Sequence, residues 1–541
     1  MPLLLAVCLV AGIVIGSFYA NHFSGNRLNI INTGSNKVAD LLRIIDDQYV
    51  DSVDMNTLVE QAMPLILNEL DPHSVYITAQ EAEASVADLK GSFSGIGVSF
   101  SIQDDTIHVI SIIKGGPSEK TGLLAGDRII SIDGESYVGP EITNEGCMKR
   151  LKGAKDTKVR VGIKRMGEPK TLYYTIVRGD VPVHSVEASY MLAPGTGYIK
   201  IKNFSETTYP EFLVALAKLN QQGLEGLVLD LRGNGGGIMQ SAIQIANIFL
   251  PADRLILYTE GRKSPREEYR SDGRGAFAHL PLVVLVDEGS ASASEIVAGA
   301  IQDNDRGTII GRRSFGKGLV QQPIEFRDGS ALRLTIARYY TPSGRCIQKP
   351  YEKGHGKEYE NDLMDRYQRG EFFSEDSIRL NGQAFHTLLG RKVYAGGGIM
   401  PDIFIPEDTS NVTSYYKEAL LTGLVYQYAL WFTDNHRSNL EAMETNRQIT
   451  AYLDKHKVVP GFAGFARGKG LAPRNLMLYK SRNLFKRSIY ASIINNIKDT
   501  DQFYQFLNAD DPAVARALSI IEAGEAFPQV SEDDTKTTAH E

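Results

Sequence analysis

The sequence predicts a multidomain α/β protein, in which an α/β core carries an inserted β-rich module, a helical N-terminal segment and an all-α C-terminal extension. Its 541 residues correspond to three or four domains of about 150 residues. From Gly197 onward, apolar strands alternate with helices, a pattern typical of a sheet covered on both faces. After Ile403 the strand pattern fades and helical periodicity replaces it.

The composition excludes several classes of protein. With 43% apolar, 23% charged and 9% aromatic residues, the chain is neither disordered nor fibrous. Lys and Arg number 58 and Asp and Glu 65, so the net charge is −7 and we expect no nucleic-acid partner. Three cysteines are too few for a disulfide framework. Neither a CxxC nor an HExxH pattern occurs, and we therefore expect no metal site.

The N-terminus carries a run of nineteen residues without a charge, from Pro2 to Ala20. As a helix this run is about 28 Å long, enough to cross a bilayer core of roughly 30 Å. A cleaved signal peptide and a retained anchor are the two interpretations. We favour the anchor, because no basic residue precedes the run and Phe18 disfavours a cleavage site ending at Ala20.

The remaining elements follow from periodicity and turn residues. Val38 to Leu70 repeats apolar residues at three- and four-residue steps, which predicts helices. The β-rich module contains runs that alternate like strands, separated by glycine turns; these runs are Ile107 to Ile113, Arg128 to Ile132, Lys158 to Lys164 and Thr171 to Val177. The core strands are predicted at Tyr198 to Ile201, Leu227 to Leu231, Leu255 to Tyr258 and Leu282 to Val286, with helices at Tyr209 to Leu219 and Ile238 to Phe249. The extension has helical patterns over Ser414 to Trp431, Leu440 to His456 and Asn475 to Ile497.

These elements divide the chain into six predicted segments. The segments are 1–21 (membrane anchor or signal segment), 36–89 (helical N-terminal region), 90–179 (β-rich module), 180–408 (α/β core), 409–526 (helical C-terminal domain) and 527–541 (disordered tail).

A serine-rich turn stands where the buried strand Leu282 to Val286 meets a helix. The stretch Gly289-Ser290-Ala291-Ser292-Ala293-Ser294-Glu295 opens that helix. A serine at such a turn lies beside free backbone N–H groups and the positive end of the helix dipole. This geometry presents an oxygen nucleophile next to donors for a developing oxyanion. The alternative is that these serines serve only as N-caps.

A second candidate element is the glycine-rich stretch Gly311 to Gly318. It resembles the phosphate-binding pattern GxxxxGK[ST], but Gly318 replaces the hydroxyl residue and a strand rather than a helix follows, so we exclude nucleotide binding. The lysine of this stretch, Lys317, lies between two glycines. Close backbone on both sides shields such a lysine from water and lowers its pKa, which suits it to act as a general base toward a serine.

On these motifs the chain resembles the carboxyl-terminal processing peptidases, also called tail-specific proteases. The resemblance covers about Val38 to Pro406. It depends on the serine-rich turn, on Phe315 to Gly318 with Gln321, and on Asp230 to Gly237; supporting matches are Leu70 to Ser74, Tyr340 to Arg345 and Gly398 to Ile403. The family has a ClpP/crotonase-like α/β protease core, and its catalytic serine and lysine lie 25 positions apart.

The resemblance implies specific roles. It selects Ser292 as the nucleophile and Lys317 as the general base, and Gln321 as the residue that orients the lysine. It places the oxyanion hole at the amide of Ala293 and at a glycine, either Gly236 or Gly237. Glu295 fits a supporting role behind these residues, or simply a favourable carboxylate in the first helical turn, which we favour.

The β-rich module resembles a PDZ domain. Its carboxylate-binding loop corresponds to the stretch with Gly95, Ile96, Gly97 and Val98. In such a loop backbone N–H groups receive a chain terminus, and the peptide adds to the sheet as a strand. A structural spacer without binding function is the alternative.

The resemblance thus implies a serine endopeptidase that needs no cofactor and cleaves protein substrates near their C-termini, with the PDZ-like module holding the tail. Combined with the apolar run, it predicts a bacterial cell-envelope protein, anchored in the membrane by one N-terminal segment with its catalytic part on the periplasmic side, or secreted if that segment is cleaved. An adaptor or activator protein and a homo-oligomer are further partners that the sequence leaves open. Two alternatives belong to other classes: a C-terminus-binding module on a protease fold that does not cut, and a crotonase-type acyl-CoA enzyme.

Overall fold

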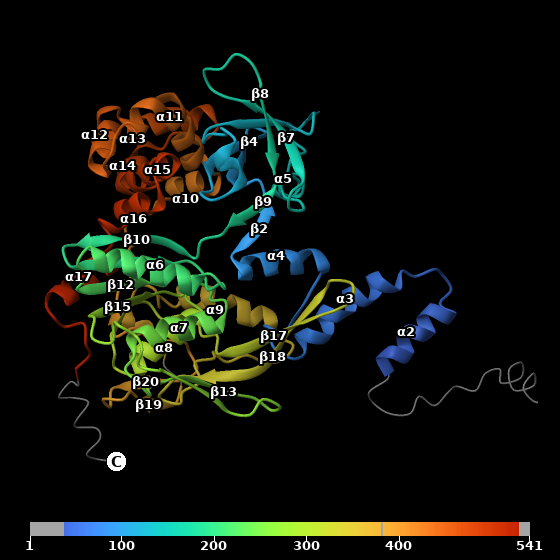
Figure 1. Ribbon diagram of the computed structural model, residues 1–541, viewed down its shortest axis with the longest axis vertical. Helices are drawn as coiled ribbons and strands as arrows, with labels where there is room; N and C mark the ends of the chain where they lie inside the picture. The colour runs from blue at the N-terminus through green and yellow to red at the C-terminus, as the bar shows by residue number, and fades with distance from the viewer. Residues whose placement is uncertain (1–36, 380–381, 530–541) are drawn as a thin grey trace, which may run out of the picture. The chain divides into compact units, whose positions relative to one another are not determined.

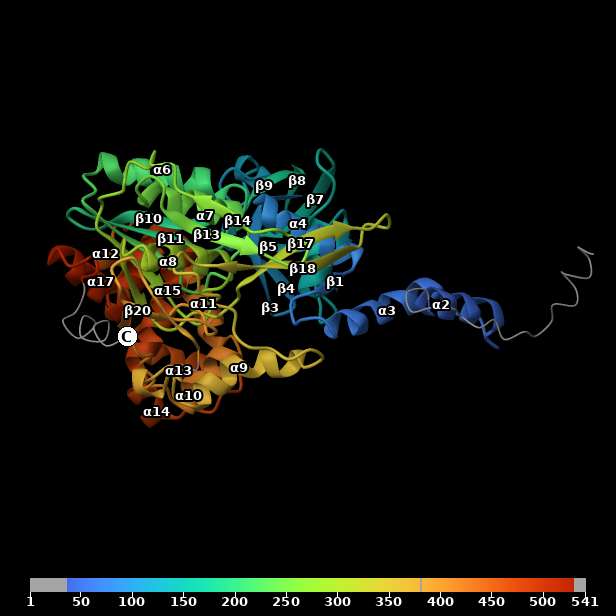
Figure 2. The same ribbon diagram turned by 90° about the horizontal axis from the view of Figure 1, so that it is seen from below.

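The computed structural model describes residues 37–379 and 382–529 (Figures 1 and 2). The chain forms two units, one up to Leu67 and one from Asn68 onward. The first unit contains α2 (Lys37–Gln48) and all but the last residue of α3 (Met55–Asn68). Both are amphipathic helices, in the region where the sequence predicts helices. The predicted segment 1–21 and residues 530–541 of the predicted tail lie outside the described residues.

The β-rich module is an antiparallel sheet that closes around its own small core. Its strand order is β3-β4-β5-β7-β8, and β6 pairs with β5. The strands are β3 (Val98–Gln103), β4 (Thr106–Ile112), β5 (Arg128–Ile132), β6 (Glu135–Ser136), β7 (Lys158–Lys164) and β8 (Leu172–Val177), with helices η1 (Pro117–Lys120) and α5 (Asn144–Leu151). The module is linked to the core by the strand pair β2 (Ser92–Gly95) and β9 (Gly179–Pro182), and α4 (Ala79–Lys90) precedes it.

The core contains a six-stranded sheet in the order β10-β11-β12-β15-β16-β21, parallel except for the edge strand β10. The strands are β10 (Val186–Ala193), β11 (Thr196–Ile201), β12 (Gly226–Asp230), β15 (Leu282–Val286), β16 (Thr308–Gly311) and β21 (Ile403–Phe404). Three helices cover one face: α6 (Thr208–Gln221), α7 (Met239–Phe249) and α8 (Ala293–Asp303). Because β12 and β15 are buried on both faces, they read as continuous apolar runs.

A second sheet lies beside the first and contains the strand that follows Lys317. Its order is β1-β18-β13-β14, and β17 pairs with β18. The strands are β1 (Val75–Ile77), β13 (Leu255–Glu260), β14 (Glu267–Arg270), β17 (Leu319–Glu325) and β18 (Ala331–Tyr340). The remaining core elements are α9 (Gly356–Gln368), η2 (Glu375–Ser377) and the hairpin β19 (Ala384–His386) and β20 (Lys392–Tyr394).

The C-terminal extension is helical, as predicted, but its helices are shorter. They are α10 (Ser414–Leu421), α11 (Leu424–Glu441), α12 (Asn446–Lys455), α13 (Val458–Gly468), α14 (Asn475–Lys480), α15 (Arg482–Ile497), α16 (Thr500–Asn508) and α17 (Pro512–Glu522). Gly423, with φ of +69°, divides the first predicted helix in two, since that left-handed conformation ends a helix and glycine adopts it without strain.

The last helix of the extension belongs to the core rather than to the bundle. Val514 and Ile520 of α17 pack on the sheet face formed by Val228, Val283 and Leu285, and Figure 1 shows α17 beside β12 and β15. These sheet residues alternate with those that face α6, α7 and α8, so α17 covers the opposite face. Each such buried Val or Ile side chain contributes roughly 1.5–3 kcal/mol.

The predicted localisation is contradicted. Within 37–379 and 382–529, no helix is long and apolar enough to cross a membrane. The longest described helix, α11, is interrupted by charged residues such as Asp434 and Arg437. The prediction of an envelope protein held by a transmembrane anchor is therefore withdrawn.

Candidate active site

Ser292 stands at the sharp turn between β15 and α8. Its φ and ψ are 54° and −113°, in a region that non-glycine residues rarely occupy and that costs of the order of 1–3 kcal/mol. The surrounding turn fixes this conformation. Asp287 Oδ1 accepts from the N–H groups of Gly233 and Gly289, at 2.8 and 3.0 Å.

The structure separates Ser292 from its two neighbouring serines. Ser290 and Ser294 are completely buried. Their hydroxyls donate to the carbonyls of Leu231 and Asn234, each at 2.8 Å. Ser292 is only partly buried. Of the three hydroxyls, that of Ser292 is the one in reach of a substrate.

Glu295 links the turn at Ser292 to the segment that contains Lys317. Its buried carboxylate accepts from the backbone N–H of Ser292 at 2.8 Å, of Gly316 at 2.7 Å and of Lys317 at 2.9 Å, and from the Ser314 hydroxyl at 2.5 Å. Burial raises the pKa of Glu295 to about 7, although these donors oppose the shift. The carboxylate thus holds the backbones of Ser292 and Lys317 together. The sequence favoured a smaller role for Glu295, as a carboxylate in the first turn of a helix.

Tyr339 makes a second link between the same two segments. Its buried hydroxyl lies 2.9 Å from the carbonyl oxygen of Lys317 and 3.2 Å from that of Ser292. No sequence motif singled out Tyr339. Its signal was only an aromatic residue near the end of a strand, which is far more often part of the core.

Lys317 lies in a setting that favours its neutral form. Burial lowers the pKa of its ammonium and the charge of Arg333 lowers it further, while Glu295 and Asp71 act in the opposite direction. Lys317 Nζ donates to Gln321 Oε1 at 3.0 Å. The structure therefore brings the predicted lysine and its predicted orienting residue into contact.

A buried turn near the start of the core holds Gln321 in place. Gln321 Nε2 donates to the carbonyl of His73. Asp71 shapes this turn by accepting from the N–H groups of His73 and Ser74, at 2.9 and 3.0 Å, and from the Thr335 hydroxyl of β18 at 3.0 Å. The Leu70 to Ser74 match thus has a physical role that the sequence did not reveal: this turn binds Gln321, which in turn contacts Lys317.

The glycine-rich turn after β12 presses directly on Ser292. A Cβ added to Gly236, whose φ is +98°, would lie 2.7 Å from both the Ala291 carbonyl oxygen and Ser292 Cβ. Ala293 begins α8, so its N–H has no partner within the helix. The Gly236 N–H already donates to Asn234 Oδ1 at 2.9 Å, which favours Gly237 over Gly236 as the second oxyanion donor.

The candidate tail-binding loop belongs to the β-rich module and not to this site. Gly95 ends β2, Val98 begins β3, and Ile96 and Gly97 connect them. The Ile96 carbonyl accepts from the backbone and side chain of Ser118, at 2.9 and 2.5 Å. β3 is the edge strand of its sheet, so among the described residues no strand pairs with its outer side.

No metal site accompanies these residues. Across the described ranges no group of three or more His, Cys, Asp or Glu side chains is arranged to hold a metal ion. The chemistry this arrangement offers is an oxygen nucleophile, a nitrogen base and backbone donors for an oxyanion.

Comparison with known proteins gives three family matches. Residues 195–355 match Peptidase family S41, residues 94–176 match the PDZ domain, and residues 415–515 match a family of unknown function, DUF8443.

Named relatives and solved structures match the chain as well. Carboxy-terminal processing protease CtpB of Bacillus subtilis (strain 168) is 38% identical over 58% of this chain and 65% of its own length, just under two thirds. The carboxy-terminal-processing protease of Bartonella bacilliformis is 39% identical over 58% of this chain and 72% of its own length. Carboxy-terminal processing protease CtpA of Bacillus subtilis (strain 168) is 31% identical over 74% of this chain and 88% of its own length. A solved structure, the photosystem II D1 C-terminal processing protease, is 26% identical with a TM-score of 0.35, over 71% of this chain and 95% of that one. On the identity and coverage of these relatives, the chain belongs to the carboxy-terminal processing proteases of peptidase family S41.

Proposed function

We propose that this protein is a serine endopeptidase that cleaves proteins near their C-termini, with Ser292 as nucleophile and Lys317 as general base. One observation carries the assignment of these residues. The buried Glu295 carboxylate accepts from the backbones of both Ser292 and Lys317, beside a glycine turn that contacts Ser292. These shared contacts support a joint role for Ser292 and Lys317.

The mechanism follows from these roles. Neutral Lys317 accepts the Ser292 hydroxyl proton as Oγ attacks the peptide carbonyl carbon. The amides of Ala293 and Gly237 donate to the oxygen that becomes negative. The lysine ammonium gives its proton to the leaving amine as the C–N bond breaks. A water molecule, deprotonated by the same lysine, then hydrolyses the ester and regenerates Ser292.

Substrate choice belongs to the module at 90–179, and cleavage to the core at 180–408. The loop from Gly95 to Val98 receives the terminal carboxylate, and the tail adds along β3. The PDZ family match and the edge position of β3 support this division. An adaptor or activator and self-association stay predictions.

The test uses the purified chain and a small folded protein with an apolar, unblocked C-terminal tail, with products read by intact mass. We expect the wild type to remove tail fragments and Ser292→Ala to bind the tail without cutting it. Amidating the terminal carboxylate is expected to weaken cleavage. Binding without cleavage by the wild type would instead favour a C-terminus-binding module, and cleavage by Ser292→Ala would refute the assignment of the site.

A further inference from the structure

Asp511 of the C-terminal extension contacts Arg232, the residue just before the glycine-rich turn. This aspartate is the N-cap of α17, and its two carboxylate oxygens do different things. Oδ1 accepts from the N–H groups of Ala513 and Val514, at 2.9 and 3.1 Å. Oδ2 accepts from Arg232 Nη1 at 2.8 Å. The same side chain therefore begins a helix of the extension and binds the first part of the glycine-rich turn.

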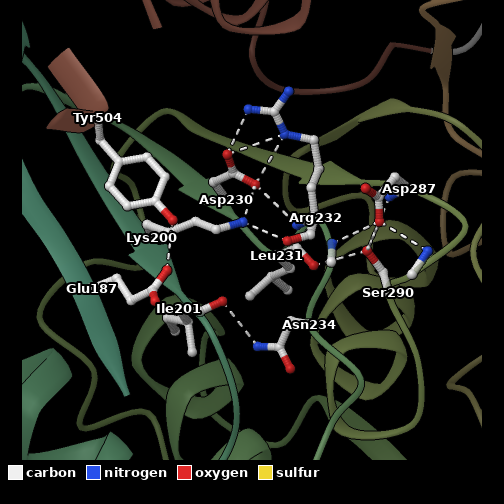
Figure 3. A network of polar contacts seen from close by, with 12 residues as sticks. Glu187, Lys200, Ile201, Asp230, Leu231, Arg232, Asn234, Asp287, Ser290 and Tyr504 are labelled. Atoms are coloured by element: carbon white, nitrogen blue, oxygen red, sulfur yellow. Dashed lines mark hydrogen bonds and ion pairs between the residues drawn. The ribbon is translucent and has the colours of Figure 1, made fainter. Parts of the chain in front are cut away.

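Arg232 joins this contact to a buried charge network (Figure 3). Asp230, at the end of β12, accepts from Arg232 Nη2 at 2.6 Å and from Lys200 Nζ at 3.2 Å. Burial by itself raises the pKa of Asp230, but the charges of Arg232 and Lys200 outweigh it and hold the pKa well below its usual range. Asp511 brings the formal charge of this four-residue network to zero. Without Asp511, the single negative charge of Asp230 would face the two positive charges of Arg232 and Lys200.

The network fixes the residues that lead into the glycine-rich turn, Gly233 to Gly237. Lys200 Nζ also donates to the Arg232 carbonyl. The next residue, Gly233, donates to Asp287 of the serine turn at 2.8 Å. Asn234 accepts from the Ala291 N–H at 3.0 Å through its carbonyl, and its side-chain oxygen accepts from the Gly236 N–H. Figure 3 shows Lys200, Asp230 and Arg232 in contact with one another, and Asn234 donating to the Ile201 carbonyl.

Packing alone does not hold this part of the turn. A cavity of about 470 Å³ lies beside it, lined among others by Lys200, Arg232, Gly233, Arg487 and Asp511. Its walls come both from the core sheet and from the helices of the extension. Since open space adjoins Arg232 and Gly233, polar contacts contribute to the position of these first residues of the turn.

The helix before Asp511 is attached to the same region of the core. Asp501 of α16 accepts from the Ser189 N–H at 2.6 Å and from Lys218 Nζ at 3.0 Å. Tyr504 donates to Glu187 at 2.6 Å, and Asn508 Nδ2 donates to Tyr190 at 2.7 Å. These contacts fix α16 along the edge strand β10, and with it the position of Asp511.

We propose that the helical extension completes the active site: Asp511 is a positioning residue that, through Arg232, holds the turn from Gly233 to Gly237 against Ser292 and Ala293. The inference rests on the proposed peptidase function. It gives a role to a region whose family match carries no known function. A shift of about 1 Å in a catalytic group can cost up to about 100-fold in rate, and we expect about tenfold for loss of this one contact.

The test compares two aspartates that cap helices of the extension, in the full chain. Asp511→Asn keeps the N-cap, because the amide oxygen still accepts from the helix, but it removes the negative charge that faces Arg232. Asp499→Asn is the matched control: Asp499 is exposed and caps α16 by accepting from Gln502 N–H at 2.9 Å. We measure kcat and KM on the tailed substrate, tail binding and the melting temperature.

Asp511→Asn is expected to lower kcat about tenfold with KM and tail binding unchanged, whereas Asp499→Asn keeps the wild-type kcat. Asp511→Glu is expected to recover part of the loss. Arg232→Lys combined with Asp511→Asn is expected to be little worse than the more damaging single variant, since both changes break one contact.

Three results would overturn the proposal. A wild-type kcat in Asp511→Asn would show that the contact positions nothing, and equal losses in Asp511→Asn and Asp499→Asn would show a general effect of helix capping. Fully additive losses in the double variant would show that the two residues act separately. In each of these cases the wild type still cleaves and the proposed function stands. A wild type that does not cleave refutes both.

Discussion

Lys317→Arg is expected to lower kcat/KM for tail cleavage by about three orders of magnitude while the protein stays folded and still binds the tail. Arginine keeps the positive charge and much of the length of the side chain. It does not lose its proton in proteins, however, so it cannot accept one from Ser292. Loss of a general base costs about 10²- to 10⁴-fold. The rate constant, the melting temperature and tail binding are measured on the same preparation.

An exposed lysine provides the control for this exchange. Lys392→Arg, on β20, is expected to leave the rate unchanged. Lys317→Arg with more than a tenth of the wild-type rate would show that Lys317 is not the base.

The pH dependence of the wild-type rate follows from the same environment. The protonated lysine is inactive, so the rate rises with pH as Lys317 loses its proton, at a pKa below the usual 10.5. Glu295, with a pKa of about 7, also loses its proton as the pH rises, and its carboxylate then accepts more strongly from its backbone donors. The pKa of His73 is lowered to about 4 by burial and by the charge of Lys317, so His73 does not titrate between pH 6 and 9. A rate that falls steadily from pH 6 to 9 would contradict the dyad.

Gly236→Ala is expected to lower kcat/KM by at least about 100-fold. The added Cβ would lie 2.7 Å from the Ala291 carbonyl oxygen and from Ser292 Cβ, and 3.0 Å from the Ala293 nitrogen. Backbone atoms cannot give way as a flexible side chain does, so the turn or the serine must move. Either movement separates the nucleophile from its oxyanion donors, and loss of one such donor costs about 10²- to 10³-fold.

The adjacent glycine is the matched control. A Cβ on Gly235 would meet nothing within 4 Å. Gly235→Ala is therefore expected to change the rate less than about threefold. Equal losses in the two variants would show that the turn tolerates no side chain at all, and equal retention would show that Gly236 does not define the position of Ser292.

The candidate catalytic residues could be named from the sequence because they lie in short, ordered motifs. Ser292, Ala293 and Glu295 follow β15, and Lys317 and Gln321 lie just before β17 and within it, so local patterns and the family resemblance pointed to them as candidates. The supporting residues were harder to predict. Asp71 acts on Gln321 across 250 positions of sequence through a backbone carbonyl, and no local pattern encodes such a contact.

The role of α17 was also beyond the sequence. Residues Pro512 to Glu522 have the same amphipathic character as helices of the bundle, so periodicity predicts a buried face but not its partner. The partner is the far face of the core sheet. Likewise, an aspartate before a proline and a helix predicts an N-cap, and only the fold shows that its second oxygen binds Arg232.

Replacing each of the three serines in turn tests the central claim most directly. Ser290→Ala, Ser292→Ala and Ser294→Ala are compared with the wild type on the tailed substrate by intact mass. We predict that Ser292→Ala alone abolishes cleavage, whereas the other two lose only buried hydrogen bonds and still remove tail fragments at a reduced rate. Cleavage by Ser292→Ala would contradict the account, and so would an inactive Ser294→Ala or Ser290→Ala beside an active Ser292→Ala.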